Sequence, residues 1–142
     1  MKPKLLLVDD EEYILQQMRW SMEADYEILT ASNEAVAIQL FEREHPSVVT
    51  LDLSLNRFKA DDLSGLRLLE RFLTSEPATR TIVITGNNED INAIRAMRLG
   101  ACDFYAKPVR LDEIKVMIQR AFHLYRLQKK NPYARLGRGR CI

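Results

Sequence analysis

Apolar and β-branched residues gather in five short runs, and between these runs apolar residues recur every three or four positions. A short apolar run bounded by polar or turn residues is typical of a buried strand, whereas the longer spacing indicates one face of a helix. The runs predict strands over Lys4–Val8, Tyr26–Ala31, Val48–Asp52, Thr81–Thr85 and Cys102–Ala106.

A helical pattern follows each run. The first helix is expected over about residues 11–24 with Asp10 as its cap, the second is capped by Ser32 or Asn33, the third spans about residues 65–75, and Gly100 ends the fourth. The expected apolar faces are Ile14, Met18 and Met22; Val36, Ala37, Leu40 and Phe41; Leu66, Leu69 and Leu73; Ile91, Ile94 and Met97; and Leu111, Ile114, Ile118, Phe122 and Tyr125. Strands that alternate with helices predict an α/β fold whose parallel sheet carries helices on both faces.

The composition fits one globular domain. The chain has 142 residues, of which 46% are hydrophobic and 29% charged, which is enough for a single core. No apolar run approaches the roughly 18 residues that span a bilayer, and the run after Lys4 is too short for a signal peptide. A cytoplasmic protein is therefore expected. Cys102 and Cys141 are too few for a disulfide framework, so reduced thiols are expected.

The net charge of +1 is unevenly distributed. The end of the chain carries basic charges without acids, whereas the preceding body is mildly acidic; the basic residues are Arg126, Lys129, Lys130, Arg135, Arg138 and Arg140. A short basic run is more often a solvated linker than a nucleic-acid surface. We expect one domain over residues 3–127 and a basic tail or linker over residues 128–142.

Polar residues that can carry chemistry stand where four expected strands end. Asp9 and Asp10 follow the first strand, Asp52 ends the third, Thr85 ends the fourth, and Lys107 follows the fifth. Parallel strands bring these residues to one edge of the sheet, where open α/β folds bind ligands. Each residue alone has an ordinary explanation as a helix cap, a loop acid, a strand residue or a surface cation. Their joint occurrence favours a functional site.

The three aspartates would raise one another's pKa values unless a cation joined them. Oxygen ligands without a nearby His or Cys favour Mg²⁺, which binds one or two carboxylates and keeps several waters. A metal held by carboxylates, with a lysine and a hydroxyl opposite, is suited to phosphoryl transfer, in which a carboxylate attacks while the cations neutralise phosphoryl oxygens.

Four motifs resemble the receiver domain of bacterial two-component response regulators, and together they cover about residues 3–127. The motifs are LLLVDDE at residues 5–11, VTLD at 49–52, IVITG at 82–86 and GACDFYAKP at 100–108. The resemblance implies a flavodoxin-like, doubly wound fold with strand order 2-1-3-4-5. It also implies a phosphoprotein that is not an enzyme beyond its own self-catalysed phosphorylation and dephosphorylation.

The resemblance further implies roles for the metal-site residues. Asp52 would accept a phosphoryl group from a phosphohistidine on a sensor histidine kinase. Asp10, Asp52 and the backbone carbonyl of Ser54 would bind Mg²⁺, for which Mn²⁺ can substitute, and Asp9 would act largely through water.

The remaining site residues would respond to phosphorylation. Lys107, in a cis Lys107–Pro108 unit, would pair with Asp52 or its phosphoryl oxygens. Thr85 would move to bond the phosphoryl group, and Phe104 would swing into the vacated space. For Phe104, simple packing on the last helix is the alternative.

One segment departs from the family pattern. Residues 54–64 form a longer loop than is typical after the acceptor aspartate, and this loop lacks proline. It is either an altered partner surface or an insertion without function, since lengthening a surface loop costs little.

Other classes of protein fit less well. A haloacid-dehalogenase-like phosphohydrolase needs a second acid at position 54, where Ser54 stands, and a flavodoxin-like nucleotide carrier needs a glycine-rich first loop, where acids stand at residues 9–12. A degenerate receiver acting as a scaffold would lack the acceptor, the metal acids or the lysine.

The output of the domain stays open at this point. The chain is expected to be the N-terminal receiver of a longer, DNA-binding transcriptional regulator, or a stand-alone receiver or phosphorelay intermediate. Its expected partners are a sensor kinase and a homodimer or effector, contacted through the face formed by the fourth helix, fifth strand and fifth helix. No membrane contact is expected, and DNA would be bound only by an effector domain absent from this chain.

Overall fold

In the computed structural model, which describes residues 1–55, 63–86 and 90–130, five strands alternate with five helices. The strands are β1 (Lys4–Val8), β2 (Glu27–Ala31), β3 (Val48–Asp52), β4 (Arg80–Thr85) and β5 (Asp103–Ala106), and the helices are α1 (Glu12–Met22), α2 (Glu34–Glu44), α3 (Ser64–Ser75), α4 (Asp90–Leu99) and α5 (Leu111–Lys130). Neighbouring strands are parallel in the order β2-β1-β3-β4-β5. The expected fold class and strand order are confirmed.

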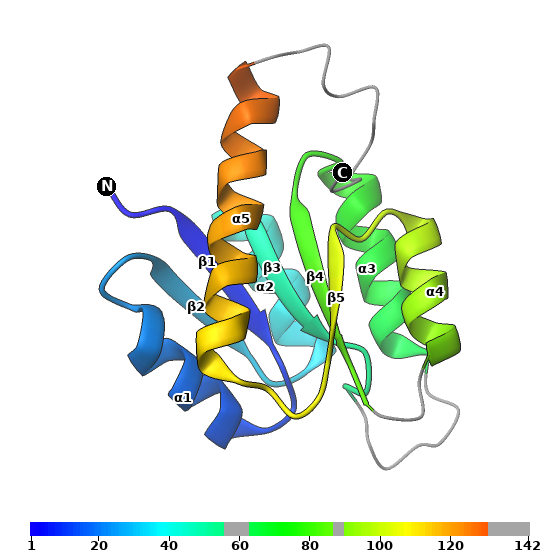
Figure 1. Ribbon diagram of the computed structural model, residues 1–142. Coiled ribbons are helices and arrows are strands. Elements are labelled where there is room, and N and C mark those ends of the chain that lie inside the picture. Colours follow the sequence, from blue (N-terminus) through cyan, green and yellow to red (C-terminus); the bar gives the residue numbers. More distant parts are fainter. Residues whose placement is uncertain (56–62, 87–89, 131–142) are drawn as a thin grey trace.

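The sheet lies between two layers of helices (Figure 1). Helices α1 and α5 cover one face, and α2, α3 and α4 cover the other. Because side chains alternate along a strand, Leu5 and Leu7 of β1 pack beneath α1 and α5, whereas Leu6 and Val8 pack beneath the other three helices. Burial on both faces explains why the strands are continuous apolar runs in the sequence.

The helix ends follow from local hydrogen bonding. Asn33 caps α2, since its side chain accepts a 3.0 Å hydrogen bond from the amide of Val36. Gly100 ends α4 with a φ of +116°, a conformation that favours glycine. The expected cap at Asp10 is wrong: α1 begins at Glu12, with Glu11 at the cap position and without a side-chain cap hydrogen bond.

The expected apolar face of α4 is also wrong. Ile91 and Ile94 are 59% and 53% exposed, and Met97 is 37% exposed, whereas the small residues Ala93 and Ala96 are buried. Small side chains let a short helix lie close to its neighbours, so the larger apolar residues of α4 are left on the surface. The structure thereby leaves an apolar strip on this side of the molecule.

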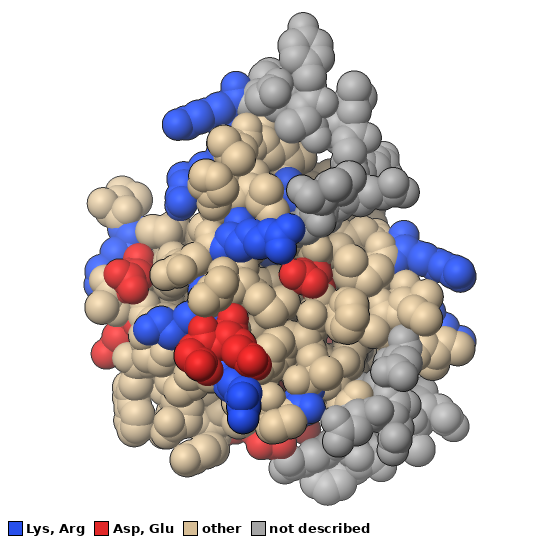
Figure 2. Space-filling model, in the orientation of Figure 1, with Lys and Arg blue, Asp and Glu red and all other residues tan. Residues whose placement is uncertain are grey.

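Helix α5 is the longest helix among the described residues and runs past the sheet. It ends at Lys130, so residues 128–130 of the expected tail are helical, while residues 131–142 lie outside the described part. Its first turn holds Asp112 and Glu113 and its last turn Lys129 and Lys130, which suits the helix dipole. Figure 2 shows acidic side chains near the lower end of α5 and basic ones at its upper end. No helix of the described residues is apolar enough over a sufficient length to cross a bilayer.

Cys102 lies just before β5 rather than within it. It is buried, and its amide donates a 2.7 Å hydrogen bond to the carbonyl of Thr81. The other cysteine, Cys141, lies outside the described residues, so the expected state of the two thiols stays a prediction.

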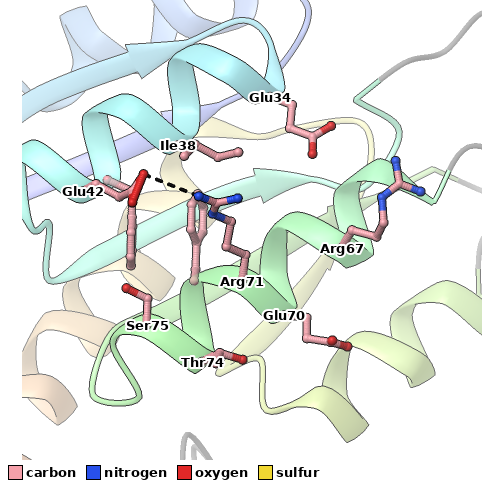
Figure 3. Close-up of a pocket in the computed structure, with 10 residues that line it drawn as sticks. Glu34, Ile38, Glu42, Arg67, Glu70, Arg71, Thr74 and Ser75 are labelled. Carbon is pink, nitrogen blue, oxygen red and sulfur yellow. Dashed lines mark ion pairs between the residues drawn. The ribbon is translucent and has the colours of Figure 1, made fainter.

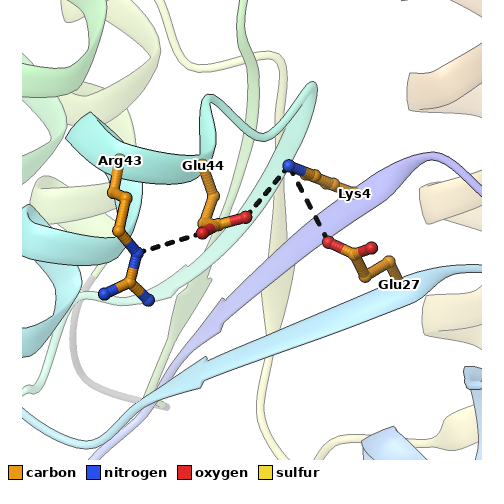
Figure 4. A network of polar contacts seen from close by, with 4 residues as sticks. All are labelled: Lys4, Glu27, Arg43 and Glu44. Carbon is orange, nitrogen blue, oxygen red and sulfur yellow. Dashed lines mark hydrogen bonds and ion pairs between the residues drawn. The ribbon is translucent and has the colours of Figure 1, made fainter.

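At the amino-terminal edge of the sheet, a charged network joins β1, β2 and α2 (Figure 4). The ammonium group of Lys4 lies 2.9 Å from a carboxylate oxygen of Glu44 and 3.9 Å from one of Glu27, and the other Glu44 oxygen accepts a 3.0 Å bond from Arg43. Because solvent screens exposed pairs of this kind, each contributes little to stability. The network ties the edge together without forming a site.

Candidate functional site

The carboxyl-terminal edge of the sheet gathers the acids that the sequence singles out. Asp9 and Asp10 follow β1, and Asp52 ends β3, which pairs directly with β1. Carboxylate oxygens of these three residues lie within 4.8 Å of one another. Asp9 and Asp52 are buried, and Asp10 is partly buried.

Asp52 is held from two sides. It is fully buried, and its Oδ1 accepts a 2.9 Å hydrogen bond from the backbone amide of Ser54. Its Oδ2 accepts a 2.8 Å hydrogen bond from Nζ of Lys107. The carboxylate is therefore fixed in orientation at the end of a strand that is buried along its whole length.

The acids carry more negative charge than their surroundings neutralise. Burial, and then the nearby Asp52 carboxylate, raise the pKa of Asp9 from 3.8 to about 7, although the Glu11 amide donates a 2.9 Å hydrogen bond to its Oδ1. Burial also raises the pKa of Asp52, against the opposing effect of Lys107. Bringing a divalent cation to these oxygens would favour their charged forms, so the donor set fits a hard metal ion.

Lys107 follows β5, the edge strand on the opposite side of the central strand β3 from β1. Its backbone amide donates a 2.8 Å hydrogen bond to the carbonyl of Thr85, and the Lys107–Pro108 peptide bond is cis, as expected. Burial alone would lower the pKa of the Lys107 ammonium group, but the hydrogen bond and charge of Asp52, with Asp9 and Glu11, raise it. Lys107 therefore stays charged at neutral pH beside Asp52.

The other sequence-derived residues lie at the same edge in different settings. Thr85 is 4% exposed at the end of β4, whereas the Phe104 ring on β5 is 49% exposed and points away from the core. Ser54 contributes its amide to Asp52. Most of the expected long loop, residues 56–62, lies outside the described residues.

A cleft of about 490 Å³ opens beside the carboxylates. It is lined by Asp9, Glu11, Ile14, Gly86, Lys107, Pro108 and Val109. A smaller cleft of about 190 Å³ between α1 and the segment before α5 shares Ile14 and Val109 with it. Only the larger cleft is lined by charged groups of the site, namely Asp9, Glu11 and Lys107. Sequence reasoning assigned no role to Glu11 or Val109, because only the fold brings α1 beside the segment that follows β5.

A third cleft, of about 580 Å³, lies between α2 and α3 (Figure 3). The stacked rings of Phe41 and Phe72, with centroids 4.1 Å apart, belong to the core beneath it, and Arg71 pairs with Glu42 at 3.6 Å across its mouth. The charged residues around it are of both signs, and it lies on the helical face rather than at the sheet edge. The carboxylate cluster is therefore the stronger candidate for the functional site.

Comparisons with known sequences agree with this geometry. The response regulator receiver domain family matches residues 5–119. The regulatory protein AtoC of Escherichia coli (strain K12) is 30% identical over 128 residues, which are 89% of this chain and 27% of AtoC. The transcriptional regulatory protein PhoP for alkaline phosphatase synthesis of Bacillus subtilis (strain 168) is 27% identical over 84% of this chain and 48% of PhoP. The chain thus spans about a quarter to a half of these relatives.

Solved structures show the same fold. A response regulator receiver domain from Clostridium thermocellum is 32% identical, with a TM-score of 0.77 over 88% of this chain and 98% of that one. The signal receiver domain of a putative LuxO repressor from Vibrio parahaemolyticus is 26% identical, with a TM-score of 0.79 over 91% and 96%. Fold, acidic cluster and family match coincide: the chain belongs to the response regulator receiver domains of two-component systems.

Proposed function

We propose that Asp52 accepts a phosphoryl group from a phosphohistidine of a sensor histidine kinase, in a reaction that depends on Mg²⁺. The observation that carries this proposal is the position of the Asp52 carboxylate, 2.8 Å from the Lys107 ammonium group and within 4.8 Å of the Asp9 and Asp10 carboxylates. A buried acid placed between a fixed cation and a metal-binding pair of acids is equipped as a nucleophile toward phosphorus.

The transfer step exchanges one bond to phosphorus for another. A carboxylate oxygen of Asp52 attacks the phosphorus in line with the imidazole nitrogen, a P–O bond forms, and the P–N bond breaks. The electron pair of the P–N bond stays on the imidazole, which takes a proton from solvent. Lys107 neutralises a phosphoryl oxygen during the transfer, which its raised pKa keeps possible at neutral pH.

The proposed metal ligands are carboxylate oxygens of Asp10 and Asp52 and the backbone carbonyl of Ser54, with Asp9 acting through water. Bound Mg²⁺, or Mn²⁺ in its place, would neutralise phosphoryl oxygens and offset the repulsion between the three acids. The raised pKa values of Asp9 and Asp52 support this assignment, since both acids gain from a nearby cation.

We further propose that phosphorylation changes the α4–β5–α5 face. Thr85 and Phe104 are the proposed switch residues, because Thr85 is buried at the end of β4 and Phe104 has an exposed ring on the adjacent strand. The exposed Ile91 and Ile94 supply apolar area on the same side for a second copy or an effector. Phosphorylation would act by shifting the population between two conformations of this face.

The proposed output is control of transcription in the cytoplasm. It is supported by relatives such as PhoP of B. subtilis, a transcriptional regulatory protein. DNA would then be bound by an effector domain rather than by the receiver. A stand-alone receiver or phosphorelay intermediate is the second candidate. In either case the domain would transfer a phosphoryl group to itself and release it by hydrolysis, without acting as an enzyme on other substrates.

The central test is incubation with acetyl phosphate, with and without Mg²⁺, followed by intact-mass measurement. The wild-type protein should gain one phosphoryl group only with Mg²⁺, and Asp52→Asn should gain none. Asp25→Asn, which changes an exposed aspartate in the turn after α1, is the matched control and should behave as wild type. Phosphorylation of Asp52→Asn, or uptake that ignores Mg²⁺, would contradict the proposal.

A further inference from the structure

The hydroxyl group of Tyr105 makes two hydrogen bonds that the phosphoryl-transfer proposal does not use. It donates to Oε1 of Glu113 at 2.6 Å and accepts from the backbone amide of Arg110 at 3.0 Å. Tyr105 lies on β5, Arg110 directly precedes α5, and Glu113 belongs to the first turn of α5. The hydroxyl group therefore joins the end of one element to the beginning of the next.

These bonds close the segment that carries Lys107. At its start, the amide of Lys107 is bonded to the carbonyl of Thr85 at 2.8 Å, and at its end the amide of Arg110 is bonded to Tyr105. The carbonyl of Arg110 in turn accepts a 3.0 Å hydrogen bond from the amide of Ile114 in α5. The segment from residue 107 to residue 110 is thus held at both ends, with the ammonium group of Lys107 fixed on Asp52 at 2.8 Å.

Packing alone does not account for the hydroxyl group. The Tyr105 ring packs against the core beneath α1 and α5, and a phenylalanine would fill the same volume there. The bond to Glu113 is short and ends on a carboxylate, which makes it stronger than a bond between neutral groups. A strong hydrogen bond at this position restricts the conformation of residues 107–110 rather than the packing of the core.

We propose that Tyr105 is a positioning residue for phosphoryl transfer. Through Arg110 and Glu113, its hydroxyl group holds the segment after β5 so that the ammonium group of Lys107 stays on the acceptor carboxylate. The inference rests on the proposed function, because the positioned group is the cation that would neutralise the incoming phosphoryl oxygens.

The test compares hydroxyl removal at two tyrosines. Tyr105→Phe, which removes both hydrogen bonds, should lower the rate constant for phosphorylation by acetyl phosphate about 3- to 10-fold. Its Mg²⁺ affinity should stay at the wild-type value, because the carboxylate cluster does not contact Tyr105. Tyr26→Phe is the matched control: that ring stacks on Phe122 at 4.6 Å on the same face, and its substitution should leave the rate unchanged.

Two further variants separate positioning from general stability. Glu113→Gln keeps an acceptor oxygen and should retain most of the wild-type rate. Glu113→Ala removes one of the two bonds and should lower the rate, but by no more than Tyr105→Phe. In a Lys107→Ala background, Tyr105→Phe should cause no additional loss of rate, because the residue through which it acts is gone. An equal loss in both backgrounds would show that Tyr105 acts on stability alone and would overturn the inference.

The outcomes also distinguish the inference from the proposal beneath it. A wild-type protein that takes up no phosphoryl group would refute both. A wild-type protein that is phosphorylated normally, together with a Tyr105→Phe variant of equal rate, would refute the positioning role only.

Discussion

Gly65 in the first turn of α3 packs directly against the backbone of Leu53, the residue that follows Asp52. A Cβ atom at position 65 would lie 2.7 Å from both the Cα atom and the carbonyl oxygen of Leu53, too close for either to stay in place. The amide of Leu53 is bonded to the carbonyl of Ile84 at 2.9 Å, so the backbone beside the acceptor is held between α3 and β4. Gly65 thus permits the approach on which the position of Asp52 depends.

Gly65→Ala should therefore affect both stability and the site. Overpacking of this kind costs about 1–3 kcal/mol of unfolding free energy, and displacement of residues 52–54 should weaken Mg²⁺ binding. Urea denaturation and a Mg²⁺ titration would measure the two effects. Gly100→Ala is the matched control, since its φ of +116° strains any side chain but it does not adjoin the site. Equal Mg²⁺ affinities in the two variants would contradict the prediction.

The raised pKa of Asp9 predicts a pH-dependent stability of the metal-free protein. Between the ordinary pKa of 3.8 and about 7, the folded state retains a proton that the unfolded chain has released. The stability contribution of this group is therefore present below about pH 4 and is lost as the pH rises through about 7. Asp9→Asn should be more stable than wild type at pH 8 in EDTA, and the difference should shrink at pH 5. Urea denaturation at both pH values is the measurement, and a difference independent of pH would count against it.

Lys107→Ala should separate metal binding from the electrostatics of the acceptor. Loss of the ammonium group leaves a buried carboxylate without one of its hydrogen-bond donors, which costs about 1–3 kcal/mol. The pKa of Asp52 should rise further, because Lys107 is the largest of the influences that lower it against the effect of burial. A ¹³C NMR titration of the carboxylates would show this rise, while Mg²⁺ should still bind. Lys115→Ala in α5 serves as the control, and an unchanged Asp52 titration in Lys107→Ala would refute the role of the pair.

The exposed apolar strip on α4 predicts an effect on association. Ile94→Ser should leave the free energy of unfolding within about 0.5 kcal/mol of wild type, because the side chain is 53% exposed. It should nevertheless reduce dimer formation after treatment with beryllofluoride and Mg²⁺, measured by light scattering during size-exclusion chromatography. Tyr13→Ser, at a 69% exposed position on α1, is the control. Dimers of wild-type stability in Ile94→Ser would exclude α4 from the interface.

The sequence carries strong information about the sheet and weaker information about the helices. Strands buried on both faces must be apolar throughout, so runs such as Leu5–Val8 locate them directly. Helix α4 buries small alanines and exposes isoleucines, so the larger apolar residues indicate the helix but not the face that is buried. The residue that caps a helix likewise depends on the conformation of the preceding turn. In α1 the cap position is occupied by Glu11 rather than Asp10.

The acids of the site could be located from the sequence because parallel strands end at a common edge. The bond from Tyr105 to Glu113 could not, since it depends on the angle at which the chain turns from β5 into α5. From the sequence alone, a strand tyrosine whose hydroxyl group makes a hydrogen bond cannot be distinguished from one that only packs against the core. Contacts of this kind require the three-dimensional arrangement of the backbone.

Helix α5 is attached near both ends of the sheet. Its first turn is tied through Glu113 to β5, and near its other end Oε1 of Gln128 accepts a 2.7 Å hydrogen bond from the guanidinium group of Arg80, where β4 begins. With 20 residues, the helix is a rod about 30 Å long. Because hydrogen bonds fix the helix near both of its ends, a tilt of α5 at one end would strain the hydrogen bond at the other. Helix α5 thereby couples the carboxyl-terminal edge of the sheet to its amino-terminal edge.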